Sequence, residues 1–149
     1  MKIADMLDGL ELVQDFKYPE LEMIAGYVMH EDADRGKVIF QEGDPGDFML
    51  IVIDGKIGIY KHGEHGRQLL SNEVKGRLVG EMSVLDHEPR SATCVAETDC
   101  ELLILTSANL KKMAAEHPTL AYHFMANLAR LLSRRLRRAS ALMADFLDQ

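Results

Sequence analysis

Residues 80–93, Gly-Glu-Met-Ser-Val-Leu-Asp-His-Glu-Pro-Arg-Ser-Ala-Thr, carry the side chains best suited to chemistry in this sequence. Arg90 can present a planar fork of N–H donors to a phosphate, and Ser91 adds a hydroxyl beside it. Glu81 is an acceptor, so it suits a sugar hydroxyl and cannot serve a phosphate. Phosphate donors beside a hydroxyl acceptor match the sugar–phosphate end of a nucleotide. The alternative is that Glu81 and Arg90 form a structural ion pair.

The stretch between these two charges offers further contacts. Residues 82–85 are predicted to form one short helical turn, whose first N–H groups are free to bind an anion. Pro89 sets the entry to the next strand, and a small residue follows at Ala92, where a backbone must come close. The candidate ligand-binding residues in this segment are therefore Gly80, Glu81, Met82, Ser83, Arg90, Ser91 and Ala92.

Short strands must position this segment. Seven runs rich in β-branched and apolar residues lie between residues 36 and 105, at 38–40, 48–53, 56–61, 67–74, 77–80, 92–97 and 100–105. Asp54-Gly55 separates two of these runs and is a strong hairpin signal. Closely spaced strands without long helices between them indicate an antiparallel sandwich or barrel of jelly-roll type. The run 48–53 is apolar on both faces, as a strand inside a closed barrel can be.

Helical patterns flank the strands. Two short lead-in helices are predicted within residues 10–35, with Pro19 starting the second. Thr106 or Ser107 is expected to cap a helix that runs to about Glu116, and Pro118 restarts the chain.

The last segment, 118–147, contains no glycine or proline, and its apolar residues follow a 3-4 heptad repeat: Tyr122, Met125, Ala129, Leu132, Leu136, Ala139, Met143 and Phe146. Thirty helical residues extend about 45 Å, which exceeds the width of a small domain. We therefore expect a homodimer through this helix. The alternative is an amphipathic helix folded onto its own barrel.

Composition narrows the class of protein. The 149 residues are 47% hydrophobic and carry a net charge of −7, which fits one ordinary domain and argues against a nucleic-acid binder. Neither a secretory signal nor a membrane-spanning run is visible, and two cysteines cannot make a disulfide framework, so we expect a cytoplasmic protein. The charge is uneven, because residues 111–138 hold seven basic residues and one acidic residue.

A family resemblance joins these features. The pattern G-E-x-S-x-L-x-x-x-P-R-S-A-T resembles the phosphate-binding cassette of the cyclic nucleotide-binding domain family. A second motif agrees: Gly36-x-x-Ile39-Phe40-x-Glu42-Gly43-Asp44-x-Gly46-Asp47, followed by Leu50-x-Val52-x-x-Gly55-x-Ile57. The resemblance implies a mainly β, α+β fold across residues 1–149, with lead-in helices, a jelly-roll β-barrel and a long C-terminal helix.

The resemblance also implies roles for single residues. Glu81 would accept the ribose 2′-hydroxyl, and Arg90 would bind the cyclic phosphate of cAMP or cGMP. The long helix would cover the base, often from the partner subunit. Arg135 could approach the ligand or Glu81. In the catabolite activators a Thr-Ser pair contacts the adenine. The corresponding pair here is Ala139-Ser140, in which Ser140 can still form a hydrogen bond and Ala139 cannot. We therefore favour cAMP.

The expected function is a cyclic nucleotide sensor that repositions its C-terminal helix. No metal is expected, because His62, Glu64 and His65 lie in one glycine-flanked loop. No nucleophile–base constellation points to an enzyme. The chain ends at Gln149, before the helix-turn-helix found in regulators of this class, so no direct DNA binding is expected. The alternatives are an interaction module with a vestigial pocket and a fragment of a larger regulator or channel.

Overall fold

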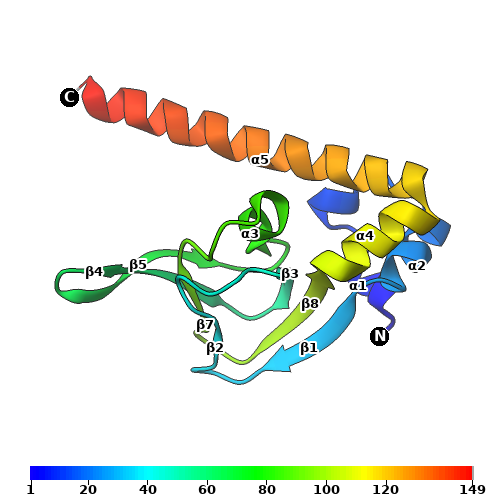
Figure 1. Ribbon diagram of the computed structural model, residues 1–149, viewed down its shortest axis with the longest axis horizontal. Coiled ribbons are helices and arrows are strands. Elements are labelled where there is room, and N and C mark those ends of the chain that lie inside the picture. Colours follow the sequence, from blue (N-terminus) through cyan, green and yellow to red (C-terminus); the bar gives the residue numbers. More distant parts are fainter. Residues whose placement is uncertain (149) are drawn as a thin grey trace.

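Eight antiparallel strands form two four-stranded sheets that enclose a shared apolar core (Figure 1). The computed structural model describes residues 1–148. One sheet has the order β1 (Met29–Ala33), β8 (Cys100–Thr106), β3 (Phe48–Asp54), β6 (Leu78–Val79). The other has the order β2 (Val38–Phe40), β7 (Thr93–Ala96), β4 (Ile57–Gly63), β5 (Gly66–Glu73). Two antiparallel sheets of this kind make a jelly roll, which confirms the predicted fold class.

Strand β3 separates two hydrophobic cores. Its side chains point alternately to opposite faces of the sheet, as in any strand. Leu50 and Val52 pack into the core between the two sheets. Met49 and Ile51 pack into a second core, which the sheet shares with the helices. The predicted two-sided burial of this run is therefore confirmed, and its cause is a helical layer on the outer face of the sheet.

The lead-in region contains a strand that the sequence pattern did not predict. The helices there are α1 (Ile3–Leu7), the short 3-10 helix η1 (Glu11–Val13) and α2 (Tyr18–Ala25), and the chain then enters β1. The expected helical lead-in over 10–35 is thus wrong in its last part. Strand β1 is mostly polar and exposed, so hydrophobic periodicity could not reveal it, and it forms only by pairing with β8.

The Asp54–Gly55 turn does not close a hairpin. Gly55 has the expected positive φ of 95°. Strand β3 pairs with β6 and β8, however, while β4 pairs with β5 and β7. The turn therefore passes the chain from one sheet to the other, a choice made by long-range pairing that the local signal cannot report.

The C-terminal helices begin where the sequence predicted. Thr106 caps α4 (Ser107–Glu116), and its side chain accepts a hydrogen bond from the Asn109 amide. Helix α5 (Pro118–Leu147) follows directly. Its first half packs against the other helices, and its second half extends beyond α3 (Glu81–Asp86), shown as the orange-to-red end in Figure 1.

The face of α5 that the domain covers is not the heptad seam. The buried apolar residues of α5 are Leu120, Ala121, Phe124 and Leu128. On the seam, Tyr122 is 77% exposed and Leu136 is 69% exposed. The helix therefore folds onto its own domain through one face, whose edge includes the seam residues Met125 and Leu132, while the other six seam residues are exposed. The two interpretations of this helix are compatible, because they use different faces.

Candidate functional site

A left-handed glycine starts the helical turn of the site. Gly80 follows β6 with a φ of 80° and caps α3, which is slightly longer than the predicted turn at 82–85. A Cβ at this position would lie 2.7 Å from Nη1 of Arg90. Glycine is therefore required here both for the backbone conformation and for the close approach of the guanidinium.

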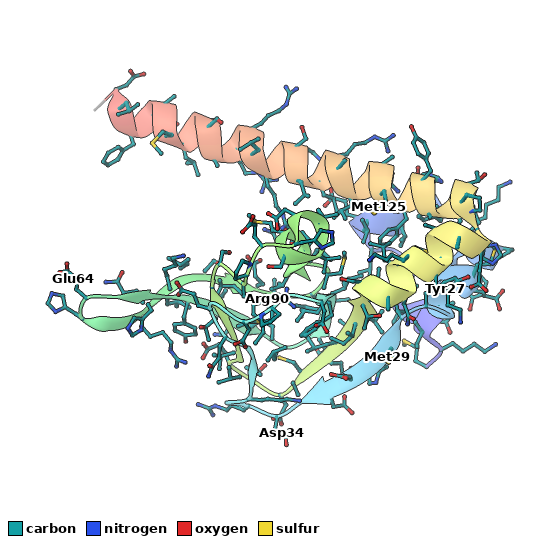
Figure 2. The ribbon with its side chains drawn as sticks, in the orientation of Figure 1. Tyr27, Met29, Asp34, Glu64, Arg90 and Met125 are labelled. Atoms are coloured by element: carbon teal, nitrogen blue, oxygen red, sulfur yellow. The ribbon has the colours of Figure 1, made fainter. Side chains whose placement is uncertain are left out.

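The Arg90 side chain is buried at the centre of the site, beneath α3 (Figure 2). Its Nη1 donates to the Gly80 carbonyl at 2.7 Å, and its Nη2 donates to the Phe48 carbonyl at 2.6 Å. The guanidinium carbon lies 4.0 Å from the ring centre of Phe40 and 4.7 Å from that of Phe48. These contacts hold the planar group in one orientation.

One donor of Arg90 has no acceptor. Its Nε is buried and makes no hydrogen bond within residues 1–148. Burial lowers the pKa of Arg90, and the nearby carboxylate of Asp47 opposes that shift. An arginine remains protonated under such conditions. The site therefore contains a buried cation with an unsatisfied donor, which an anion would complete.

The predicted alternative of a Glu81–Arg90 ion pair is wrong. Across residues 1–148, no carboxylate lies within 4.0 Å of the Arg90 guanidinium nitrogens. Glu81 instead accepts from Nη1 of Arg135 at 3.1 Å, and Arg135 also donates to the Leu78 carbonyl at 3.2 Å. Of the two expected positions for Arg135, the structure thus has the one beside Glu81.

Glu81 is a buried acceptor. Its side chain is only 7% exposed, and burial raises the pKa of its carboxyl group, although the Arg135 charge works against this shift. Among the side chains of residues 1–148, Arg135 is the hydrogen-bond partner of this carboxylate, and it contacts Oε1 alone. The group therefore keeps capacity to accept a hydroxyl hydrogen bond at the pocket.

The predicted cassette residues converge on one pocket of about 380 Å³. The lining residues are Phe40, Ile59, Gly80, Glu81, Met82, Ser83, Arg90, Ser91 and Ala92. All seven candidates of the 80–93 segment are among them. Glu81 and Arg90 thus line the same pocket as the hydroxyls of Ser83 and Ser91 and the small residues Gly80 and Ala92. A sugar–phosphate ligand would need such a combination.

Four contributors to the site were not assigned to it from the sequence. Phe40 and Phe48 place their rings, tilted 73° to each other, against the Arg90 guanidinium, and Ile59 lines the pocket. Phe40 belongs to the second motif, so it was visible as a motif residue but not as a site residue. Gly46 is also close, because a Cβ there would lie 2.1 Å from Cβ of Ser83. These contacts come from strands and turns distant in sequence, and no local pattern signals them.

Ser140 does not reach the pocket. It is exposed on the second half of α5, where it lies with Ala139, Met143, Ala144 and Leu147 around a separate open hollow. The structure therefore assembles the predicted phosphate and ribose contacts of the site in one chain, but not the predicted base contact.

Other candidate chemistry lies elsewhere. Glu64 marks the tip of the β4–β5 hairpin, far from Arg90 (Figure 2), and His65 follows it in the turn. In residues 1–148, the metal-ligating atoms that gather within 4.8 Å of one another belong to His30, Asp32 and Glu101. This group lies outside the pocket. No helix among these residues is long and apolar enough to span a membrane.

A family model agrees with the site. The model described as "Cyclic nucleotide-binding domain" matches residues 31–117, which contain both motifs.

Curated relatives point in the same direction. The chain is 34% identical over 134 residues to the "Cyclic AMP receptor protein" of Thermus thermophilus, covering 89% of this chain and 60% of that protein. It is 32% identical over 117 residues to the "CRP-like cAMP-activated global transcriptional regulator" of Mycobacterium tuberculosis, covering 78% of this chain and 50% of that protein. The chain therefore spans only about half to three-fifths of these relatives.

Solved structures show the same fold. A cyclic nucleotide-binding domain from Methylobacillus flagellatus superposes with a TM-score of 0.84 at 29% identity, covering 96% of this chain and 81% of that chain. The Thermus thermophilus catabolite activator protein gives a TM-score of 0.79 at 35% identity, covering 93% and 63%.

Proposed function

The chain belongs to the cyclic nucleotide-binding domain family, and on this premise we propose that it is a regulatory sensor that binds cAMP in preference to cGMP and catalyses no reaction. Residues 1–149 would act as one ligand-binding domain. The observation that carries the proposal is the buried Arg90, whose Nε has no acceptor among residues 1–148, in a pocket lined by the rest of the cassette. A cyclic phosphate would supply that acceptor.

The ribose end of the ligand would use Glu81. Its buried carboxylate can accept the 2′-hydroxyl while Arg135 holds it from the side of α5. Ser83 and Ser91 line the same wall and would add hydroxyl donors to the phosphate. The preference for cAMP is supported by curated relatives described as cAMP-activated and by a relative described as a cAMP-dependent protein kinase regulatory subunit.

Signalling would pass through α5. Arg135 connects Glu81 in the pocket to this helix, so a ligand that engages Glu81 acts directly on a helix contact. The bare second half of α5 would pair with a second copy and bring Ser140 towards the base. Ligand binding would then favour the arrangement in which the helix covers the base, as a shift between pre-existing states. The downstream partner would read the position of this helix.

Calorimetric titration with cAMP and cGMP tests the proposal directly. The protein is first unfolded, freed of bound nucleotide and refolded, and its absorbance is checked for residual purine. We expect saturable binding of both ligands, with cAMP the tighter. Folded, nucleotide-free protein that binds neither ligand would contradict the proposal.

Substitution of the phosphate contact gives the sharpest variant. Arg90→Ala is expected to weaken cAMP at least about thirtyfold, because it removes a buried charged partner of the phosphate. Arg90→Lys keeps the charge but not the fork, and its thermal unfolding shows whether the cavity still folds. The matched control is Arg137→Ala, because Arg137 is exposed and makes no hydrogen bond or ion pair within residues 1–148. Normal binding by folded Arg90→Ala would overturn the role of this residue.

The ribose contact is tested with 2′-deoxy-cAMP. The wild-type chain is expected to prefer cAMP over this analogue by about tenfold, and Glu81→Gln should reduce that preference. Burial raises the pKa of Glu81, so its carboxylate becomes protonated at a higher pH than an exposed glutamate does. The preference should therefore decline as the pH falls from neutral towards acidic values, while Glu81→Gln stays flat. A pH-independent preference in the wild type would rule out this role.

A further inference from the structure

The basic stretch of α5, Arg134 to Arg138, lies beside a hollow that is separate from the nucleotide pocket. Arg134, Arg135 and Arg138 project from this helix towards the barrel, and Arg77 meets them from the turn between β5 and β6. These four arginines line this small hollow together with Glu11 and Gly76. None of its lining residues belongs to the nucleotide pocket. The sequence scattered these charges over two regions, and the fold brings them together.

The floor of this hollow is apolar. Leu12 from the lead-in region, Ile51 from β3, Leu78 from β6 and Leu131 from α5 line it beneath the arginines. The first three of these side chains are buried, so their positions are set by the core. A cavity with an apolar floor and a few charged groups at its rim is the usual form of a site for an organic anion.

Three of the four arginines are already held in place by glutamates. Arg77 pairs with Glu73 at 2.9 Å, Arg134 with Glu11 at 3.0 Å and Arg135 with Glu81 at 3.1 Å.

Arg138 has no acidic partner within residues 1–148. Four arginines against three glutamates leave one positive charge in excess, in a chain whose net charge is −7. Arginines that are held in position lose little side-chain freedom when they bind a further acceptor. The rim therefore carries a local net positive charge on an acidic molecule, and this charge favours the binding of an anion.

The hollow also opens away from the heptad seam. An α-helix advances about 100° per residue, so Arg134 and Arg138 each lie about 160° around the axis from the seam residue Leu136. A second copy that pairs along the seam would approach the opposite side of α5. The hollow therefore stays open in the homodimer that we propose.

From these observations we propose that the hollow is a second ligand site, which takes a small phosphorylated molecule with an apolar or aromatic body. Arginine forks bind phosphate oxygens through paired hydrogen bonds, and Arg77 and Arg138 both line the hollow. The body of the ligand would lie on the floor formed by Ile51, Leu78 and Leu131. This site is separate from the nucleotide pocket, and Arg135 is the residue that touches both.

The test uses phenyl phosphate as the probe, titrated into the full ¹⁵N-labelled chain with cAMP in excess. We expect saturable shifts of the Gly76 amide and of the Arg77 and Arg138 Nε–H signals. Inorganic phosphate should bind more weakly, because it cannot contact the floor. Arg138→Gln should weaken phenyl phosphate about tenfold or more, as should Arg77→Gln. Arg137→Gln is the matched control, since it removes the same charge one position away, and it should change the affinity less than about twofold.

Three outcomes would overturn the proposal: no saturable shift, an equal loss in Arg137→Gln, or shifts confined to Ser83 and Ser91 in the nucleotide pocket. The same titration in Arg90→Ala separates this proposal from the function proposed above. Phenyl phosphate should still bind that variant at Gly76, whether or not the wild-type chain binds cAMP. Arg138 is exposed, so Arg138→Gln remains a folded test even where Arg77→Gln lowers stability.

Discussion

The two halves of α5 carry the same kind of apolar repeat in opposite environments. In the first half, Phe124 is 2% exposed and Leu128 is 1% exposed, because they pack against the lead-in helices and the outer face of β3 and β8. In the second half, Leu142 is 66% exposed and Phe146 is 70% exposed. The domain therefore determines the position of the first half, whereas the described residues from Leu136 onward are exposed.

This difference divides the nucleotide pocket as well. Arg90 and Glu81, the residues proposed to contact the phosphate and the ribose, line one pocket within a single chain, and Arg135, just past the middle of α5, holds Glu81. The residue predicted to meet the base, Ser140, lies on the bare half. The residues proposed for the phosphate and the ribose are thus already in place within one chain. The position of Ser140, the residue proposed for the base, depends instead on what packs against the second half of α5.

The largest expected effect is the difference in stability between the same leucine-to-alanine substitution made in the first and in the second half of α5. Leu128→Ala should lower the free energy of unfolding by about 2–5 kcal/mol, because it leaves a cavity in a packed core. Leu142→Ala should change the intrinsic stability of one chain by less than about 0.5 kcal/mol, because its side chain is exposed. The free energy of unfolding of each variant is measured by urea unfolding in a Leu136→Glu, Met143→Glu background, which removes the predicted dimer. Equal losses would mean that the bare half is covered within the same chain.

A second prediction concerns what covers the bare half. Leu136→Glu combined with Met143→Glu should convert a dimer into a monomer, because it places charges in the heptad seam. Light scattering after size exclusion measures the mass. Ala141→Glu is the control, since this exposed position lies about 140–160° around the helix from both seam residues. A wild-type chain that is already monomeric at tens of micromolar would contradict the prediction.

The smallest expected effect concerns the base. Ser140→Ala should weaken cAMP by about threefold in the paired protein, the size of one lost neutral hydrogen bond. The same substitution should have no effect in the Leu136→Glu, Met143→Glu variant, where the second copy is absent. Ser133→Ala, one heptad earlier and equally exposed, serves as the control in calorimetry. A full effect of Ser140→Ala in the monomeric variant would place the base contact within one chain.

Local signals predicted the elements that an apolar run or a capping residue marks. The run 48–53 was visible because it is continuously apolar, and the start of α4 at Thr106 because capping is a local property. Strand β1 was missed because its exposed, polar residues carry no such period. The predicted turn at Asp54–Gly55 is present, but the predicted hairpin is wrong. Strands β3 and β4 do not pair with each other, because each pairs with other strands in a different sheet.

The sequence by itself determined which chemistry the site can carry. A glutamate and an arginine nine residues apart, with glycine, serine and alanine around them, define an acceptor and a donor whatever their surroundings. Only the tertiary structure decided how they are used. It set Arg90 against two phenylalanine rings and left its Nε without a hydrogen-bond partner among residues 1–148, and it paired Glu81 with Arg135 instead of Arg90.

The charge of the chain follows the same division. The sequence showed that basic residues concentrate in 111–138 of an otherwise acidic protein. Folding joined three of those arginines to Arg77 over an apolar floor, and it turned the predicted heptad seam away from the domain that covers the other face of α5. Residue type depends on the sequence alone, but burial and pairing depend on contacts between distant segments, so the fold decides which charges are satisfied and which await a ligand.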